Sequence, residues 1–344
     1  MVVERITFNQ SRIKTFNNCP KSYEYKYIEL IEPKRKARPL FLGSWIHSAL
    51  ESVYKDESWK VGHQPYVDEW NKLFEEERAE MMEKYKVPLP EVVERIIKSY
   101  LWYYRNDGWK PVMVEKILEV ETPLVIDGKK VIFKGRLDLV IEDEEGKYWL
   151  VDHKTASTIP QPTAFHAMDP QLMLYPWAAK IQYGIDLAGI QYNYLRSRPA
   201  SIPKLTARGA ISRRKIVTDY PTLFRFLKSN GYNPNDFADI LRPLAKRSPL
   251  LRRYRLPREE HVTREVLRDV LSVVKRIQST KRFTRTITRD CVRCPYVDIC
   301  RSELNGFDTT LMRKKFFQTV QEDYVVGNSN PDELEEDSDE DEEG

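Results

Sequence analysis

The spacing of apolar positions in the first hundred residues is that of amphipathic α-helices. In the first segment, apolar side chains recur at helical intervals at Ile13, Phe16, Tyr23 and Tyr27. This spacing predicts a helix over residues 11–30, with Ser11 as its N-cap and a break at Cys19-Pro20. Further helices are predicted over residues 43–54, 66–85 and 90–104. The last two would form a helical insertion within about residues 60–108.

The apolar period changes to two from about residue 112, which indicates β-strands. Strand-like runs follow one another at residues 112–114, 118–120, 131–141, 148–154 and 188–195. Asp127-Gly128 between two of these runs is a hairpin signal. Asp169-Pro170 is a suitable start for a helix to about residue 182, and another helix is predicted over residues 263–278. Strands interleaved with helices predict an α/β fold, with a central mixed sheet flanked by helices.

Charge is distributed unevenly along the 344 residues, although the net charge is only +4. Residues 331–344 hold ten acidic residues and no Lys or Arg, and we expect this tail to be disordered. Residues 196–258 hold sixteen Lys and Arg residues against three aspartates. A basic body suggests a polyanionic partner such as nucleic acid, and a plain solvated surface is the alternative interpretation of this stretch.

The sequence contains no apolar run of about 18 residues, so we expect no transmembrane helix. Its first ten residues do not have the pattern of a signal or transit peptide. These features predict a cytoplasmic protein, or one of the host cytoplasm if a phage encodes it. In that compartment four cysteines are more readily explained by metal binding or catalysis than by disulfides.

Two predicted strands end in charged residues that bear on chemistry. Asp138 ends the first strand, and Asp152 and Lys154 end the next. Side chains alternate along a strand, so Asp152 and Lys154 share a face, and Asp138 would join them if it lies across the ladder. Two crowded carboxylates repel each other unless a divalent cation takes both as ligands. The alternative is a surface salt bridge between Asp152 and Lys154.

The four cysteines fall into a cluster of three and one distant member. The cluster is Cys291, Cys294 and Cys300, and the fourth is Cys19. Thiolates are soft ligands, which leaves an iron–sulfur cluster or zinc as the choices, and the spacing alone does not separate them. Four ordinary buried cysteines are the remaining alternative.

Taken together, these motifs resemble those of the RecB-like nucleases of the PD-(D/E)xK superfamily. More narrowly, they are similar to the iron–sulfur branch that includes AddB and the CRISPR-associated exonucleases. Six motifs occur in the order of the family between residues 11 and 300. They are the segment around Cys19, Gly43-x₃-His47, Gly135-Arg-Leu-Asp138, Asp152-His-Lys154, Gln171-x₃-Tyr175 and Cys291-x₂-Cys294-Pro-x₄-Cys300.

The resemblance implies a restriction-endonuclease-like core with a helical insertion and an iron–sulfur clasp. It implies a single nuclease domain over residues 1–310, which includes the basic region at about 196–258 and the cysteine cluster at 291–300. Residues 311–330 would be a C-terminal extension before the acidic tail. All four cysteines would hold a 4Fe–4S cluster, with Zn²⁺ as the alternative occupant.

The resemblance also implies the residues of a hydrolytic site that uses Mg²⁺ or Mn²⁺. The expected metal ligands are His47, Asp138, Asp152 and the backbone carbonyl of His153. Lys154 would assist the attacking water and the transition state. Gln171 and Tyr175 would complete the catalytic group.

By the same resemblance, the expected activity is that of a DNA exonuclease on single-stranded or frayed ends, in recombination, repair or phage DNA processing. A separate helicase or recombination protein is a conceivable partner. DNA-binding candidates in the basic region are Arg213, Arg214, Lys215, Arg252, Arg253 and Arg255. Two alternatives remain open: a non-cleaving DNA-binding module of a recombination or repair complex, and a zinc-stabilised nucleic-acid adaptor.

Overall fold

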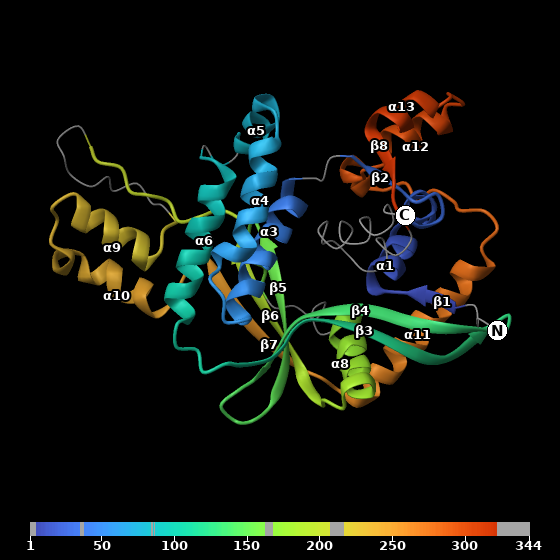
Figure 1. Ribbon diagram of the computed structural model, residues 1–344, viewed down its shortest axis with the longest axis horizontal. Helices are drawn as coiled ribbons and strands as arrows, with labels where there is room; N and C mark the ends of the chain where they lie inside the picture. The colour runs from blue at the N-terminus through green and yellow to red at the C-terminus, as the bar shows by residue number, and fades with distance from the viewer. Residues whose placement is uncertain are drawn as a thin grey trace, which may run out of the picture. The chain divides into compact units, whose positions relative to one another are not determined.

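The computed structural model describes residues 5–34, 38–83, 85, 87–161, 168–206 and 217–321 (Figure 1). The chain divides into two compact units. Unit 1 comprises residues 1–36, 117–136 and 264–344, and unit 2 comprises residues 37–116 and 137–263. Two long strands, β3 (Lys110–Ile126) and β4 (Lys129–Glu142), contribute residues to both units.

The sheet of unit 2 is mixed. Its strands lie in the order β4-β5-β6-β7, where the last three are β5 (Tyr148–Ala156), β6 (Leu187–Arg196) and β7 (Leu251–Pro257). Pairing is antiparallel between β4 and β5, parallel between β5 and β6, and antiparallel between β6 and β7. The apolar run Trp149-Leu-Val151 at the start of β5 is buried, as expected of a central strand.

Helices cover both faces of this sheet (Figure 1). The three that matter for the site are α3 (Arg38–Tyr54), α6 (Leu89–Tyr104) and α8 (Pro170–Tyr183). Buried side chains of α3 and α6 form one apolar cluster with Leu195 of β6 and Leu251 of β7. Gln171 of α8 contacts Asp152 on the opposite face. A mixed sheet flanked by helices confirms the predicted fold class.

The helical insertion contains three helices where the sequence predicted two. They are α4 (Lys60–Lys72), α5 (Glu75–Met82) and α6. The predicted helix over residues 66–85 is divided at Leu73 and Phe74, which are both extended. The three glutamates that follow favour a new helix N-terminus, because their charge complements the helix dipole. Helix α4 crosses α3 so closely that a Cβ on Gly62 would lie 2.0 Å from the carbonyl oxygen of Ser48.

The rest of unit 2 follows β6 as a small helical cluster. Helix α9 (Tyr220–Ser229), a 3₁₀ turn (Pro234–Phe237) and α10 (Ala238–Lys246) pack around Leu223, Leu227 and Leu241. Helix α11 (Glu260–Ser279) begins at the end of unit 2 and continues into unit 1. None of the described helices is long and apolar enough to cross a membrane.

In unit 1, the N-terminal strand β1 (Arg5–Phe8) runs parallel to the first part of β4. The turn between β3 and β4 is Asp127-Gly128, and both residues have positive φ, 49° and 75°. This is the backbone of the predicted two-residue hairpin. Helix α1 (Gln10–Asn18) ends at the predicted break, before α2 (Pro20–Tyr23) and one π-helical turn (Glu24–Ile28).

The predicted N-cap of α1 was wrong. Asn9 caps the helix, because its extended backbone lets its side chain accept a hydrogen bond of 2.8 Å from the backbone N–H of Arg12. Ser11 lies inside the helix, where its backbone carbonyl accepts a hydrogen bond from the hydroxyl of Thr15.

Two segments that are far apart in the sequence pair within unit 1. Strand β2 (Ile31–Pro33) pairs antiparallel with β8 (Phe317–Thr319). Three short elements precede β8 in the sequence. They are a 3₁₀ turn (Arg289–Arg293), α12 (Val297–Leu304) and α13 (Thr310–Phe316). An apolar cluster joins both ends of the chain and contains Tyr25, Ile31, Tyr296, Ile299 and Phe317. The acidic tail lies outside the described residues.

Candidate functional site

The two aspartates lie side by side on neighbouring strands. Leu139 of β4 pairs with Val151 of β5, and the next pair in this antiparallel register is Asp138 with Asp152. Asp152 is 3% exposed. Asp138 accepts a hydrogen bond of 3.1 Å from the backbone N–H of His153. The two carboxylates therefore lie close enough to act on each other electrostatically.

Lys154 and Gln171 hold the Asp152 carboxylate from two sides. The Lys154 ammonium lies 2.9 Å from Oδ1 and 2.7 Å from Oδ2 of Asp152. The Gln171 amide donates to Oδ1 at 2.8 Å, and its own oxygen accepts from Lys154 at 3.4 Å. Gln171 is positioned by the start of α8, where the Asp169 side chain accepts from its backbone N–H. The three side chains thus form a closed polar group at the end of β5.

Burial and charge act together on this group. Burial raises the pKa of Asp152, and Asp138 adds to the rise, while Lys154 counteracts it. For Lys154, burial alone would lower the pKa, but the Asp152 carboxylate more than offsets this and the pKa lies above its usual value. Tyr175 of α8 lies close enough to contribute to the raised pKa of Lys154. The lysine is therefore a charged ammonium at neutral pH.

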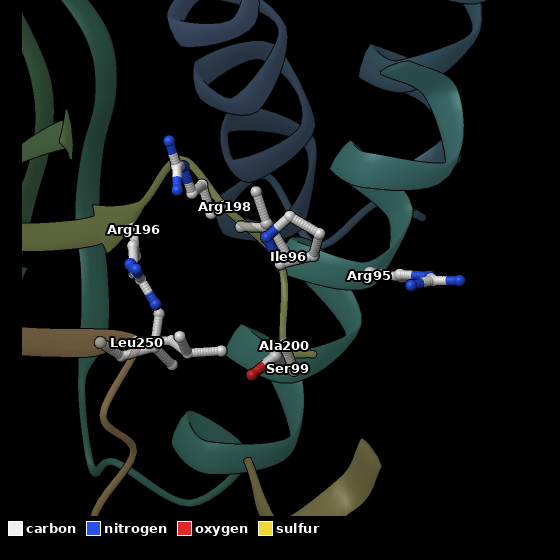
Figure 2. Close-up of a pocket in the computed structure, with 9 residues that line it drawn as sticks. Arg95, Ile96, Ser99, Arg196, Arg198, Ala200 and Leu250 are labelled. Carbon is white, nitrogen blue, oxygen red and sulfur yellow. The ribbon is translucent and has the colours of Figure 1, made fainter. Parts of the chain in front are cut away.

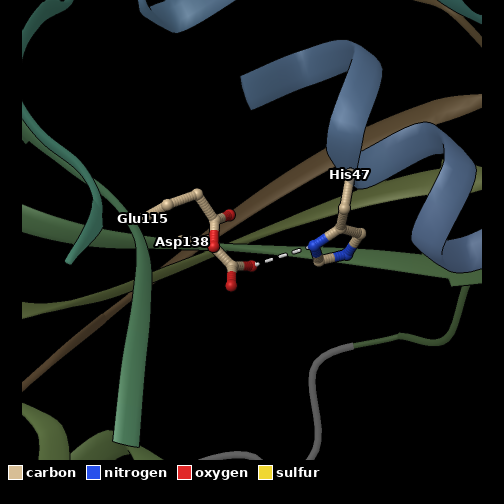
Figure 3. Close-up of side chains that lie close together, drawn as sticks. All are labelled: His47, Glu115 and Asp138. Atoms are coloured by element: carbon tan, nitrogen blue, oxygen red, sulfur yellow. Dashed lines mark ion pairs between the residues drawn. The ribbon is translucent and has the colours of Figure 1, made fainter. Parts of the chain in front are cut away.

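A third acidic residue joins Asp138 and His47 (Figure 3). Ligand atoms of His47, Glu115 and Asp138 all lie within 4.8 Å of one another. His47 Nε2 lies 2.7 Å from the backbone carbonyl oxygen of His153, and Nδ1 lies 3.5 Å from Oδ2 of Asp138. Because a carbonyl oxygen only accepts, Nε2 donates to it, and this orientation directs Nδ1 towards the Asp138 carboxylate.

Helix α3 approaches the sheet closely at this point. A Cβ on Gly43, one turn before His47, would lie 3.4 Å from Oγ1 of Thr155 on β5. This part of α3 thus lies in contact with β5 where His47 reaches the His153 carbonyl.

Sequence reasoning missed Glu115. It lies in β3 directly after Val112-Met-Val114, and its φ of 48° is in the left-handed region. A non-glycine residue with this backbone is strained, and such strain concentrates at functional sites. In the sequence, Glu115 is visible only as an acidic residue that follows a short apolar run of a predicted strand. This pattern does not show which residues of other segments lie beside Glu115.

These donors fit a divalent metal ion. The carboxylates of Asp138 and Glu115 provide hard oxygen ligands, and His47 provides an imidazole nitrogen within 4.8 Å of them. The Asp152 oxygens lie outside this group of three, where the Lys154 ammonium contacts both of them.

The structure separates the DNA-binding candidates of β7 onto two faces. Arg252 pairs with Tyr194, which pairs with Lys154, so Arg252 lies on the face of the catalytic candidates. Arg253 and Arg255 lie on the other face. There they form ion pairs of 2.9 Å with Asp107 and 2.8 Å with Asp143, respectively. The candidates Arg213, Arg214 and Lys215 lie outside the described residues.

A pocket near the end of β6 is lined by Arg95, Arg196 and Arg198 together with residues of α6 and with Leu250 and Leu251 (Figure 2). Arg196 at the end of β6 pairs with Ala156, two residues past Lys154 on the same face. Arg198 follows and is exposed. Figure 2 shows Arg95 of α6 directed away from these two. Two arginines, Arg196 and Arg198, thus lie at and just after the end of β6.

The four cysteines come together in unit 1, and none forms a disulfide. Burial raises the pKa of the Cys294 thiol, and the other three cysteines lie close enough to raise it further. Two N–H groups point at sulfurs: Arg285 Nε lies 3.3 Å from Cys300 Sγ, and the backbone nitrogen of Thr286 lies 3.5 Å from Cys19 Sγ. Donated hydrogen bonds of this kind suit thiolate ligands.

Two solved structures show a low similarity to this chain. A search of curated proteins finds no match. Among solved structures, SSO0001 matches with 14% identity and a TM-score of 0.31, over 88% of this chain and 89% of that one. A protein of Eubacterium rectale, named as a candidate exonuclease, matches with 13% identity and a TM-score of 0.43, over 84% of this chain and 87% of that one.

One sequence profile covers most of the chain. It describes the PD-(D/E)XK nuclease superfamily and matches residues 7–301. This range includes the aspartates of β4 and β5, Lys154 and all four cysteines. The chain therefore belongs to the PD-(D/E)XK nuclease superfamily.

Proposed function

We propose that this nuclease is a metal-dependent DNA exonuclease that hydrolyses phosphodiester bonds at single-stranded or frayed ends. The observation that carries the proposal is the group formed by Asp138, Asp152 and Lys154 with His47 and Glu115 beside it. Lys154 compensates the Asp152 carboxylate, and a bound cation would compensate the neighbouring carboxylates of Asp138 and Glu115.

Each residue has a distinct role in this proposal. His47, Asp138, Asp152, the His153 carbonyl and Glu115 would hold Mg²⁺ or Mn²⁺. The ion supplies a Lewis acid and lowers the pKa of a water molecule. Lys154 remains charged beside Asp152, and its ammonium attracts the scissile phosphate and stabilises the charge that develops on it. Gln171 holds both side chains in place, and Tyr175 lies beside the lysine.

The proposal is tested with purified protein on single-stranded, duplex and circular DNA, labelled at either end. We expect linear DNA to be degraded from an end, circles to be spared, and chelation to abolish cleavage. Mn²⁺ should support more activity than Mg²⁺, since imidazole is the poorer ligand for Mg²⁺. Cleavage of circles would contradict the exonuclease assignment. DNA binding without cleavage in either metal would favour a non-cleaving module instead.

If Glu115 binds the metal ion, its replacement should change the metal requirement of cleavage, whereas replacement of an exposed glutamate should not. Glu115→Gln keeps the shape but removes a charged ligand, so the Mn²⁺ concentration for half-maximal cleavage should rise about tenfold. The matched control is Glu121→Gln on the same strand, where Glu121 forms an exposed ion pair with Lys130. Equal metal requirements in the two variants would show that Glu115 does not bind the ion.

We also propose that Arg196, Arg198 and Arg252 bind the phosphates of the DNA strand beyond Lys154. The Arg196→Gln, Arg198→Gln double variant should bind single-stranded DNA more weakly. The slope of log K against log salt should fall by about 0.7 for each lost phosphate contact. Arg242→Gln, an exposed change on α10, is the control. An unchanged slope in the double variant would remove these arginines from the DNA path.

For the four cysteines we propose a 4Fe–4S cluster, with Zn²⁺ as the alternative. The closeness of the other three cysteines to Cys294 and the N–H groups directed at the sulfurs of Cys300 and Cys19 support a site with four thiolate ligands. The motif resemblance favours the iron–sulfur cluster over zinc. Its role would be to join the C-terminal segment of unit 1 to the end of α1.

The resemblance of the motifs supports the remaining parts of the proposal. We propose a cytoplasmic protein that acts in recombination, repair or phage DNA processing. A separate helicase or recombination protein would supply unwound DNA to it.

A further inference from the structure

The side chain of His153 points away from the proposed metal site into a buried polar network. His153 is 4% exposed and Asn193 of β6, its partner in the register, is 0% exposed. The Asn193 amide nitrogen lies 2.7 Å from His153 Nδ1. The His153 ring also stacks on Tyr54 of α3, with ring centroids 5.7 Å apart.

Asn193 joins three groups in this network. Its NH₂ group donates to His153 Nδ1 and to the hydroxyl of Tyr100, the latter at 3.0 Å. Its oxygen accepts from Arg253 Nε at 3.4 Å. Arg253 is itself fixed by the ion pair with Asp107 and by stacking over Trp109, with 3.5 Å between guanidinium and ring centroid. Three hydrogen bonds thus fix the orientation of the Asn193 amide.

The backbone of the same histidine touches two proposed metal ligands. Its N–H donates to Asp138 at 3.1 Å, and its carbonyl accepts from His47 at 2.7 Å. Along a strand the backbone and the side chain of one residue move together. A displacement of the His153 side chain would therefore move the groups that orient Asp138 and His47.

We propose that Asn193 is a positioning residue for the metal site, which acts through His153. The amide holds the imidazole from the far face of the sheet, and the His153 backbone in turn holds Asp138 and His47. The proposal rests on the metal site proposed above, and it assigns a role to a residue outside that site. Groups that orient ligands in this way typically alter metal affinity or activity by about 10- to 100-fold.

The test is Mn²⁺ binding to the full-length protein, measured by calorimetry without DNA. Asn193→Leu should weaken Mn²⁺ binding about tenfold. The matched control is Gln191→Leu. Gln191 is a buried amide on the same face of β6. It pairs in the register with Val151 rather than with His153, and its oxygen accepts from Arg255 at 2.7 Å. Both variants remove a buried amide, so both should lower the unfolding temperature, but only Asn193→Leu should change Mn²⁺ affinity.

A second variant keeps the test decisive if Asn193→Leu does not fold. His153→Phe retains the stacked ring and deletes the hydrogen bond to Asn193, and it should weaken Mn²⁺ binding to a similar extent. The double variant should show no further loss, because both changes break one connection. Equal affinities in Asn193→Leu and Gln191→Leu, or in His153→Phe and wild type, would overturn the role of Asn193. Asp138→Ala tests the site itself: if it binds Mn²⁺ as wild type does, the metal site fails rather than its support.

Discussion

Replacement of Lys154 by methionine should lower the rate of DNA cleavage by about a thousandfold. The change keeps the apolar stem but removes the ammonium that contacts both oxygens of Asp152. It also removes the interaction that counteracts the raised pKa of the Asp152 carboxyl. The Asp152 pKa should therefore rise further in the variant, so the carboxylate becomes protonated at a higher pH. As the pH is lowered, the remaining activity should be lost at a higher pH than in wild type. Single-turnover cleavage measured across pH checks both effects.

Lys147→Met is the control for this experiment. Lys147 lies in the turn before β5, and its ammonium pairs with Glu145. This variant should cleave DNA as wild type does, with the same pH profile. DNA affinity, measured with chelator present, should be largely unchanged in the Lys154 variant. A parallel loss of binding and cleavage would mean that Lys154 supports the structure rather than the chemistry.

The second large effect is expected at the cysteines. Cys291→Ser replaces a soft thiolate of the proposed iron–sulfur cluster by a hydroxyl, so we expect this variant to contain no iron and to show no visible absorption. Unit 1 should then become more sensitive to proteolysis, because the C-terminal segment is no longer joined to the end of α1. Iron content, absorption spectra and limited proteolysis measure these changes.

Val292→Ser is the matched control for the cysteine variant. Val292 is the next residue in the same 3₁₀ turn and is 85% exposed, so this variant should keep its iron and its colour. If the wild-type protein is colourless and contains one zinc ion per chain, the four cysteines bind zinc and not an iron–sulfur cluster. A wild-type protein with neither metal would mean that the four thiols are not ligands at all.

The local part of the site was predictable because it depends on periodicity within one element. Asp152 and Lys154 share a face because strand side chains alternate, and His47 follows Gly43 by about one helical turn. The hairpin at Asp127-Gly128 and the helix break at Cys19-Pro20 have local causes as well. These interactions extend over a few residues, so a single segment of sequence is enough to reveal them.

Contacts between distant segments required the structure. Glu115 reaches Asp138 and His47 only through the course of β3 and α3, which no motif records. The connection of Asn193 to the metal site depends on the pairing of β6 with β5. Likewise, a basic run on β7 does not reveal that Arg253 is buried against Trp109 while Arg252 shares the face of Lys154.

The amino-acid sequence by itself determined the α/β class, the superfamily and the order in which the motifs follow one another. Only the tertiary structure shows which polar groups contact one another. It shows that Arg253 and Arg255 form ion pairs within the protein, and that Glu115 lies beside Asp138 and His47. The reason is physical. Hydrophobic periodicity and turn chemistry act along the chain, whereas burial, strand register and electrostatic partnership arise only when segments far apart in sequence pack together.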